Sequence, residues 1–160
     1  MLRQLTLIIC FVMTQGACSH LQSPASNSLD YSPSYHRSTA SKDFDTVIEE
    51  LLFAISNENY NVTSINRVGK AIAERHDISF PEYTIINSCN LEIAKQFLDI
   101  SPRFISVMPC RIAVWQDANK VHVSAHLLPE TLQDCVVLCK QTNDLLKRVV
   151  DFSVSEELGL

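Results

Sequence analysis

Cysteine offers more chemistry than any other residue type in this sequence. The chain has six cysteines, and four of them lie in its second half: Cys89, Cys110, Cys135 and Cys139. Cys89 closes one predicted strand and Cys110 lies in the next, so we expect both at the same end of a sheet. Three roles are open for this pair: a disulfide, a redox-active thiol pair, or a soft-metal site completed by Met108.

Other thiol chemistry has less support. Nucleophilic catalysis would need a histidine beside a thiol, and nothing in the sequence brings His76 or His122 to one. The chain also lacks the CxxC pairs that are typical of structural zinc sites. Cys135 and Cys139 are one helical turn apart beside an apolar stripe, so we expect them to be buried core thiols.

A second candidate site follows from the pairing of two predicted strands, residues 110–116 and 121–127. A turn centred on Ala118 and Asn119 places six apolar residues on one face, which predicts the core side: Cys110, Ile112, Val114, Val123, Ala125 and Leu127. The other face then carries a mixed set: Arg111, Trp115, His122, Ser124 and His126.

Three uses of this mixed face remain open. Arg111 and Trp115 could bind a small anionic or aromatic ligand through charge and stacking. The same residue types are enriched at subunit interfaces, which favours a dimer contact. An antiparallel sheet can also simply expose one face to water. A two-histidine metal site is disfavoured, because His122 and His126 are four residues apart on a strand, roughly 13 Å.

The elements that must position these residues follow from periodicity and end signals. Helices are predicted over residues 44–56, 68–75, 91–98 and 129–152. Asp43 is expected to cap the first helix, and either Ser88 or Asn90 the third. Strands are predicted over residues 36–40, 60–65, 83–87, 104–116 with a break at Pro109, and 121–127.

The N-terminus has the layout of a secretory signal peptide, with Arg3 before an apolar run over residues 5–13. That run is shorter than the ~20 residues that span a bilayer. Gly16-Ala17-Cys18 resembles a bacterial lipobox, although Gln15 stands where leucine is usual. We therefore expect lipidation at Cys18 and a membrane anchor, with ordinary cleavage near Ala17 as the alternative.

The expected domain organisation follows from this leader. Residues 1–18 form the signal, 19–36 a Ser/Pro/Asn-rich disordered tether, 37–152 the folded domain and 153–160 a tail. Ser19, with no aspartate after the cysteine, resembles the signal for the outer membrane. We expect the protein on the periplasmic side of that membrane, or soluble in the periplasm if it is cleaved without lipidation.

Composition excludes several functions. The net charge is −5 and no dense Lys/Arg cluster occurs, so no nucleic-acid partner is expected. Three glycines, without a GxGxxG or Walker pattern, argue against phosphate-cradling loops. No cofactor is expected.

The stretch Ser88-Cys89-Asn90, followed by residues 108–114 (MPCRIAV), resembles the domain-of-unknown-function 302 family, also called TT1751-like. That family has Cys-Asn at the start of a short helix, then Pro-Cys before an alternating hairpin, which here ends at Val123-Ser124-Ala125. The resemblance covers residues 35–150, and the family's cysteines correspond to Cys89 and Cys110. Leu91 departs from it, because proline is usual there.

The resemblance implies an α+β fold of the TBP-like kind, in which helices pack on one face of an antiparallel sheet. It also implies self-association as a dimer, and it implies no reaction. The first hypothesis is therefore an exported, lipid-anchored, non-enzymatic domain that binds a small ligand or a partner. The second is a thiol-dependent redox or soft-metal protein that works through Cys89 and Cys110. A hydrolase or transferase with an unrecognised site comes third.

Overall fold

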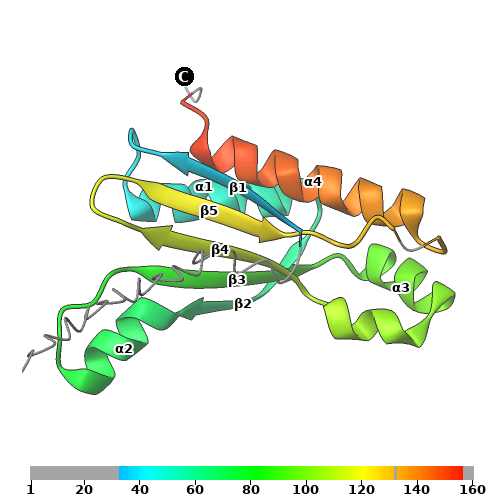
Figure 1. The fold of residues 1–160 in the computed structure, drawn as a ribbon, viewed down its shortest axis with the longest axis horizontal. Coiled ribbons are helices and arrows are strands. Elements are labelled where there is room, and N and C mark those ends of the chain that lie inside the picture. Colours follow the sequence, from blue (N-terminus) through cyan, green and yellow to red (C-terminus); the bar gives the residue numbers. More distant parts are fainter. Residues whose placement is uncertain (1–32, 132, 157–160) are drawn as a thin grey trace, which may run out of the picture.

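The computed structural model describes residues 33–131 and 133–156, which form an antiparallel sheet flanked by helices (Figure 1). Five strands run in the order β1-β5-β4-β3-β2. They are β1 (Ser34–Thr39), β2 (Asn61–Arg67), β3 (Tyr83–Cys89), β4 (Cys110–Gln116) and β5 (Val121–His126). The helices are α1 (Phe44–Asn57), α2 (Val68–His76), α3 (Leu91–Ile100), the 3-10 helix η1 (Pro102–Val107) and α4 (Val136–Val154). The α+β class expected from the sequence is confirmed.

The expected leader, the lipidation site Cys18 and most of the expected tether lie outside the described residues. β1 begins at Ser34, so the folded domain starts slightly before the boundary expected at residue 37. Within residues 33–131 and 133–156, no helix has the length and apolar character needed to cross a membrane.

The main core lies between the sheet and two helices, α1 and α4, which pack against each other on one face (Figure 1). Ile86 and Ile112 on neighbouring strands are fully buried, as is Leu51 of α1. Burying a side chain of this size stabilises the fold by about 1.5–3 kcal/mol. The alternation of apolar residues along β3, β4 and β5 therefore fixes which face of the sheet these two helices cover.

The predicted hairpin register is confirmed between β4 and β5. Ile112 lies opposite Ala125, and Trp115 lies opposite His122. Trp115, His122 and the other residues that alternate with the buried ones point away from α1 and α4. We call that side of the sheet the open face. It carries Tyr83, Ile85, Asn87, Arg111, Ala113, Trp115, His122, Ser124 and His126.

Two helices have the N-terminal caps that the sequence predicts, one an aspartate and one an asparagine. Asp43 accepts a hydrogen bond from the Thr46 backbone N–H at 2.9 Å and so caps α1. Asn90, rather than Ser88, caps α3, because its Oδ1 accepts from the N–H groups of Glu92 and Ile93. A single residue, Asn90, therefore separates the end of β3 from the start of α3.

The expectation that a strand starts near Phe104 is wrong. Residues 102–107 form η1, and β4 begins only at Cys110, after the cis peptide bond between Met108 and Pro109. Phe104 and Val107 are three residues apart, which is the period of a 3-10 helix, and both pack on the cluster around Phe97. Packing against α3 thus overrides the strand propensity of this stretch.

The start expected for the last helix, at Pro129, is also wrong. α4 begins at Val136, because the preceding chain is held against α4 by Asn143. The amide of Asn143 bonds both the N–H and the C=O of Leu128, at 2.8 and 2.9 Å, and these backbone groups cannot join a helix. At its far end α4 runs to Val154, past the expected boundary at residue 152.

Cys135 and Cys139 are bonded to each other, so the expectation of two free core thiols is wrong. Their Cα atoms are 5.5 Å apart, within the range of about 4.4–6.8 Å that a disulfide requires. Cys135 precedes the first residue of α4, where the backbone is not yet helical. Both residues are buried, as expected.

Candidate functional site

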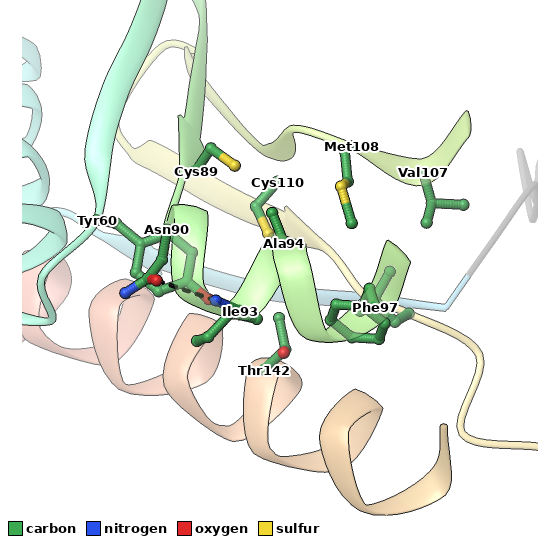
Figure 2. Close-up of a pocket in the computed structure, with 11 residues that line it drawn as sticks. Tyr60, Cys89, Asn90, Ile93, Ala94, Phe97, Val107, Met108, Cys110 and Thr142 are labelled. Atoms are coloured by element: carbon green, nitrogen blue, oxygen red, sulfur yellow. Dashed lines mark hydrogen bonds between the residues drawn. The ribbon is translucent and has the colours of Figure 1, made fainter. Parts of the chain in front are cut away.

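Cys89 and Cys110 line one cavity, at the end of the sheet where α3 begins (Figure 2). Both are free thiols. The cavity lies between the main core and the smaller cluster around Phe97. Its wall consists mainly of apolar and sulfur-bearing side chains: Tyr60, Cys89, Asn90, Ile93, Ala94, Phe97, Val107, Met108, Cys110, Leu128 and Thr142.

Strand pairing brings the two thiols together. Cys89 is the last residue of β3 and Cys110 the first of β4, and Ser88 pairs directly with Cys110. Asn90 fixes the turn between β3 and α3, because it caps α3 and also donates from Nδ2 to the Asn59 carbonyl at 3.0 Å. The sequence expectation that Cys89 and Cys110 lie at the same end of the sheet is met.

The electrostatics of the cavity disfavour a nucleophilic thiol. Burial, and then the neighbouring Cys89, raise the pKa of Cys110 to about 11. Burial also raises the pKa of Cys89. Reactive cysteines usually have lowered pKa values, because a cation or a helix N-terminus stabilises the thiolate. No lysine, arginine or histidine is among the described residues that line this cavity, so neither His76 nor His122 assists a thiol.

Tyr60 contributes a buried hydroxyl to the same cavity. Tyr60 is 5% exposed, and its hydroxyl has no hydrogen-bond partner in the described part of the chain. Burial raises its pKa, charge on Cys110 raises it further, and the neighbouring Thr142 hydroxyl lowers it. Tyr60 therefore adds a polar group to a wall that is otherwise mainly apolar and sulfur-bearing.

Size limits what this cavity can hold. Its volume is about 30 Å³, whereas sites for drug-sized ligands measure about 300–1,000 Å³. A water molecule or a single ion fits such a space. An organic ligand does not fit without rearrangement, which excludes this cavity as a preformed small-molecule site.

The open face holds a second constellation, a stack of three rings. Trp115 lies 5.0 Å from His122 and 5.4 Å from His36 between ring centroids, and the two histidines are 5.2 Å apart. The planes are within 18° of parallel. His36 comes from β1, the strand on the other side of β5, so three strands build the stack.

Hydrogen bonds order the two histidines. His122 Nε2 lies 2.8 Å from Asp117 Oδ2, and His122 Nδ1 lies 3.1 Å from His36 Nε2. A carboxylate only accepts, so Nε2 of a neutral His122 carries the proton and Nδ1 accepts from His36. Burial, the neighbouring His122 and Arg37 lower the pKa of His36, which favours its neutral form at pH 7.

The structure brings together only part of the predicted mixed face. Trp115 and His122 are in contact, whereas Arg111 lies at the opposite end of β4 and no hydrogen bond or ring contact links it to the stack. Ser124 and His126 are half-buried along β5. Sequence reasoning missed His36 and Asp117. The alternation of β1 could have placed His36 on a face, but not beside Trp115.

An apolar groove runs beside this stack. It has a volume of about 390 Å³ and lies between α2 and the start of β3, with Trp115 at its edge. Its wall is formed mainly by large apolar side chains: Val68, Ile72, Phe80, Tyr83, Ile85 and Trp115. Unlike the thiol cavity, this groove is large enough to take the side chains of a partner or an apolar ligand.

Metal ligands of the common kinds are not clustered. Within residues 33–131 and 133–156, no group of three histidine, cysteine, aspartate or glutamate side chains is placed to hold an ion. This leaves the sulfur atoms of the thiol cavity as the donor set to consider.

These features define a small α+β domain with a half-buried pair of thiols and, in the described part of the chain, a sheet face that α1 and α4 do not cover. The family model described as "Domain of unknown function DUF302" matches residues 35–152, and the chain belongs to that family. The resemblance found in the sequence is thus confirmed.

A solved structure shares the fold. The crystal structure of an uncharacterized conserved protein DUF302 from Bacillus stearothermophilus aligns with a TM-score of 0.67 and 17% sequence identity. The alignment covers 76% of this chain and 98% of that chain. No curated protein matches the chain.

Proposed function

We propose that this protein is an exported, lipid-anchored and non-enzymatic binding protein whose open face joins a second copy of the chain. The observation that carries the proposal is the apolar groove of about 390 Å³ on that face, bounded by Trp115. The raised thiol pKa values and the small thiol cavity support a binding role over catalysis.

The open face has the composition of an interface rather than of a solvated surface. Phe80 and Tyr83 are 37% and 38% exposed, and their rings lie 5.8 Å apart. A solvated antiparallel sheet usually alternates apolar residues toward the core with polar ones toward water. Here Ile85 and Trp115 break that alternation, and exposed apolar patches of this kind mark interaction sites.

A second copy is the partner that the family resemblance favours. Strands about 4.8 Å apart and about 20 Å long give a five-stranded face of roughly 500 Å². A specific interface usually buries ~800 Å² per partner. We therefore expect a weak dimer whose population rises with protein concentration, with α2 adding to the contact.

Sedimentation equilibrium over a range of protein concentrations tests the dimer. Trp115→Ala should reduce association by about tenfold or more, because large aromatic residues dominate interface energetics. Val137→Ala is the matched control, since Val137 is 69% exposed on α4, away from the open face. A wild-type chain that stays monomeric at all concentrations would refute the proposed dimer. The groove would then be a binding site for a ligand instead.

Lipid anchoring rests on the leader and is tested separately. Cys18→Ala should release the protein from membranes in an extraction assay, because the variant loses the site of lipid attachment while the folded domain is unchanged. Membrane association that does not change with Cys18→Ala would refute the anchor.

The thiol cavity supports a second candidate function. Cys89 and Cys110 are free and share one wall, as a redox or soft-metal protein requires. Their raised pKa values weigh against thiol–disulfide exchange, which proceeds through a thiolate. A soft metal ion displaces the thiol protons as it binds, so binding of a thiophilic ion is the stronger form of this candidate.

A further inference from the structure

We propose that the cavity between Cys89, Cys110 and Met108 binds a soft monovalent metal ion, with Cu(I) as the ion that its donors fit. The proposal develops the second candidate function and does not depend on the open face. Loss of copper binding would leave dimer formation untouched, so the two proposals fail separately.

The donor set carries the proposal. Figure 2 shows the side chains of Cys89, Cys110 and Met108 reaching the cavity from the same side, with α3 opposite. Two thiols and one thioether are soft ligands, and such ligands select Cu(I) over magnesium, calcium or manganese. Pairing of β3 with β4 sets the positions of the two thiols before any ion arrives.

The size and the donor atoms of the cavity favour a single soft ion. Its volume of about 30 Å³ admits one ion but no organic ligand. Binding of one Cu(I), which keeps its oxidation state, displaces the proton of each thiol to water, because the thiolate is the form that ligates a metal, and the site then carries one net negative charge. The thioether of Met108 binds as a neutral donor. Zinc is disfavoured, because it usually takes four nitrogen, oxygen or sulfur ligands and the described residues offer no such cluster.

The Tyr60 hydroxyl is placed to support a bound ion. It is buried beside Thr142 and interacts electrostatically with both Cys110 and Cys89. A thiolate formed by metal binding is an acceptor in the same cavity. Hydrogen bonding to ligand atoms of this kind orients and strengthens many metal sites.

Anaerobic transfer of Cu(I) from a coloured chelator of known affinity tests the site. The whole chain, purified in mild detergent, carries Cys10→Ala and Cys18→Ala, so that the leader thiols do not bind copper. We expect one Cu(I) per chain and a thiolate-to-copper absorption band. Cys110→Ala and Met108→Leu should each weaken binding by about tenfold or more.

Met108→Leu keeps the side-chain volume, so it separates loss of the thioether from misfolding, and circular dichroism confirms the fold of each variant. Val107→Ala is the matched control, because Val107 lines the cavity without a donor atom. Its affinity should equal that of the parent. The proposal is overturned if the parent takes no copper from the chelator, or if Cys110→Ala and Met108→Leu bind copper as the parent does.

Discussion

At the scale of single residues, the pKa values of the two free thiols differ. Cys89 is half-buried and its pKa is raised by burial alone, whereas burial and Cys89 together raise the pKa of Cys110 to about 11. The thiolate is the form that reacts with alkylating agents. Both thiols are half-buried, so we expect the higher pKa of Cys110 to leave it with less thiolate than Cys89 near neutral pH.

We expect iodoacetamide to label Cys89 faster than Cys110 at pH 8, and labelling of Cys110 to accelerate as the pH approaches 11. Peptide mass mapping after timed labelling measures both rates. Cys135 and Cys139 serve as internal controls, because their disulfide leaves them unlabelled until a reductant and a denaturant are added. Equal rates at Cys89 and Cys110 in the folded protein would contradict the higher pKa of Cys110.

Asn143 is a buried polar residue whose loss should lower stability. It is 1% exposed, and its amide bonds the N–H and C=O of Leu128 and the carboxylate of Glu130. Asn143→Ala leaves two buried backbone groups of Leu128 without partners, at about 1–3 kcal/mol for each. We expect a loss of roughly 2–4 kcal/mol in urea unfolding.

Thr142→Ala is the matched control, because Thr142 is its equally buried neighbour and bonds only its own helix, at the Leu138 carbonyl. It should cost clearly less than Asn143→Ala. Equal losses for the two variants would show that the chain around Leu128 does not depend on the Asn143 amide.

At the scale of elements, α2 packs closely against the start of β3 because Gly69 has no side chain to separate them. A Cβ on Gly69 would lie 2.2 Å from the Pro81 carbonyl oxygen and 2.7 Å from the Tyr83 N. Both are backbone atoms, which cannot turn aside as a flexible side chain would. Helix α2 and the start of β3 therefore approach one another only with glycine at this position.

Gly69→Ala should destabilise the protein, although alanine is the better helix former by about 1 kcal/mol. The physical reason is the forced separation of α2 from β3, which also widens the apolar groove. Thermal unfolding measures the effect. Ala71→Gly in the same helix is the control, because there only the helix propensity of the residue changes. A stabilised Gly69→Ala variant would show that α2 can shift without cost.

At the scale of the whole molecule, an ion pair ties the end of α1 to α4. Arg148 donates to both carboxylate oxygens of Glu58, at 2.8 and 2.9 Å. The hydrogen bond from Arg148 lowers the pKa of Glu58 below its ordinary value of 4.5. This pair joins residues 90 positions apart, so it reports on the folded state alone.

Folding lowers the pKa of Glu58. The ion pair therefore stabilises the protein at pH values above the pKa of Glu58 in the unfolded chain, and this contribution is lost as the pH falls through the lower pKa of Glu58 in the folded protein. Arg148→Met should remove about 0.5 kcal/mol near pH 7, a small amount because Arg148 is largely exposed to screening by solvent. The difference from wild type should shrink below pH 4, and urea unfolding at several pH values measures it. A difference that stays constant down to acidic pH would exclude the ion pair as its cause.

Local rules in the sequence determined much of this protein. The caps at Asp43 and Asn90 and the register of the β4–β5 hairpin follow from neighbours in the chain, because helix ends and tight turns involve residues a few positions apart. The alternation of apolar residues likewise fixed the core face. The spacing of Cys89 and Cys110 around one predicted helix correctly placed both at one end of the sheet.

Only the tertiary structure decided which side chains meet across the fold. His36 lies 86 positions before His122 and reaches the Trp115 stack from β1. Tyr60, just before β2, reaches the thiol cavity. Packing on Phe97 turned an expected strand into η1, and the anchoring of Leu128 by Asn143 delayed α4. These outcomes depend on the free energy of contacts between distant segments, which overrides local propensity and which no pattern in one stretch of sequence contains.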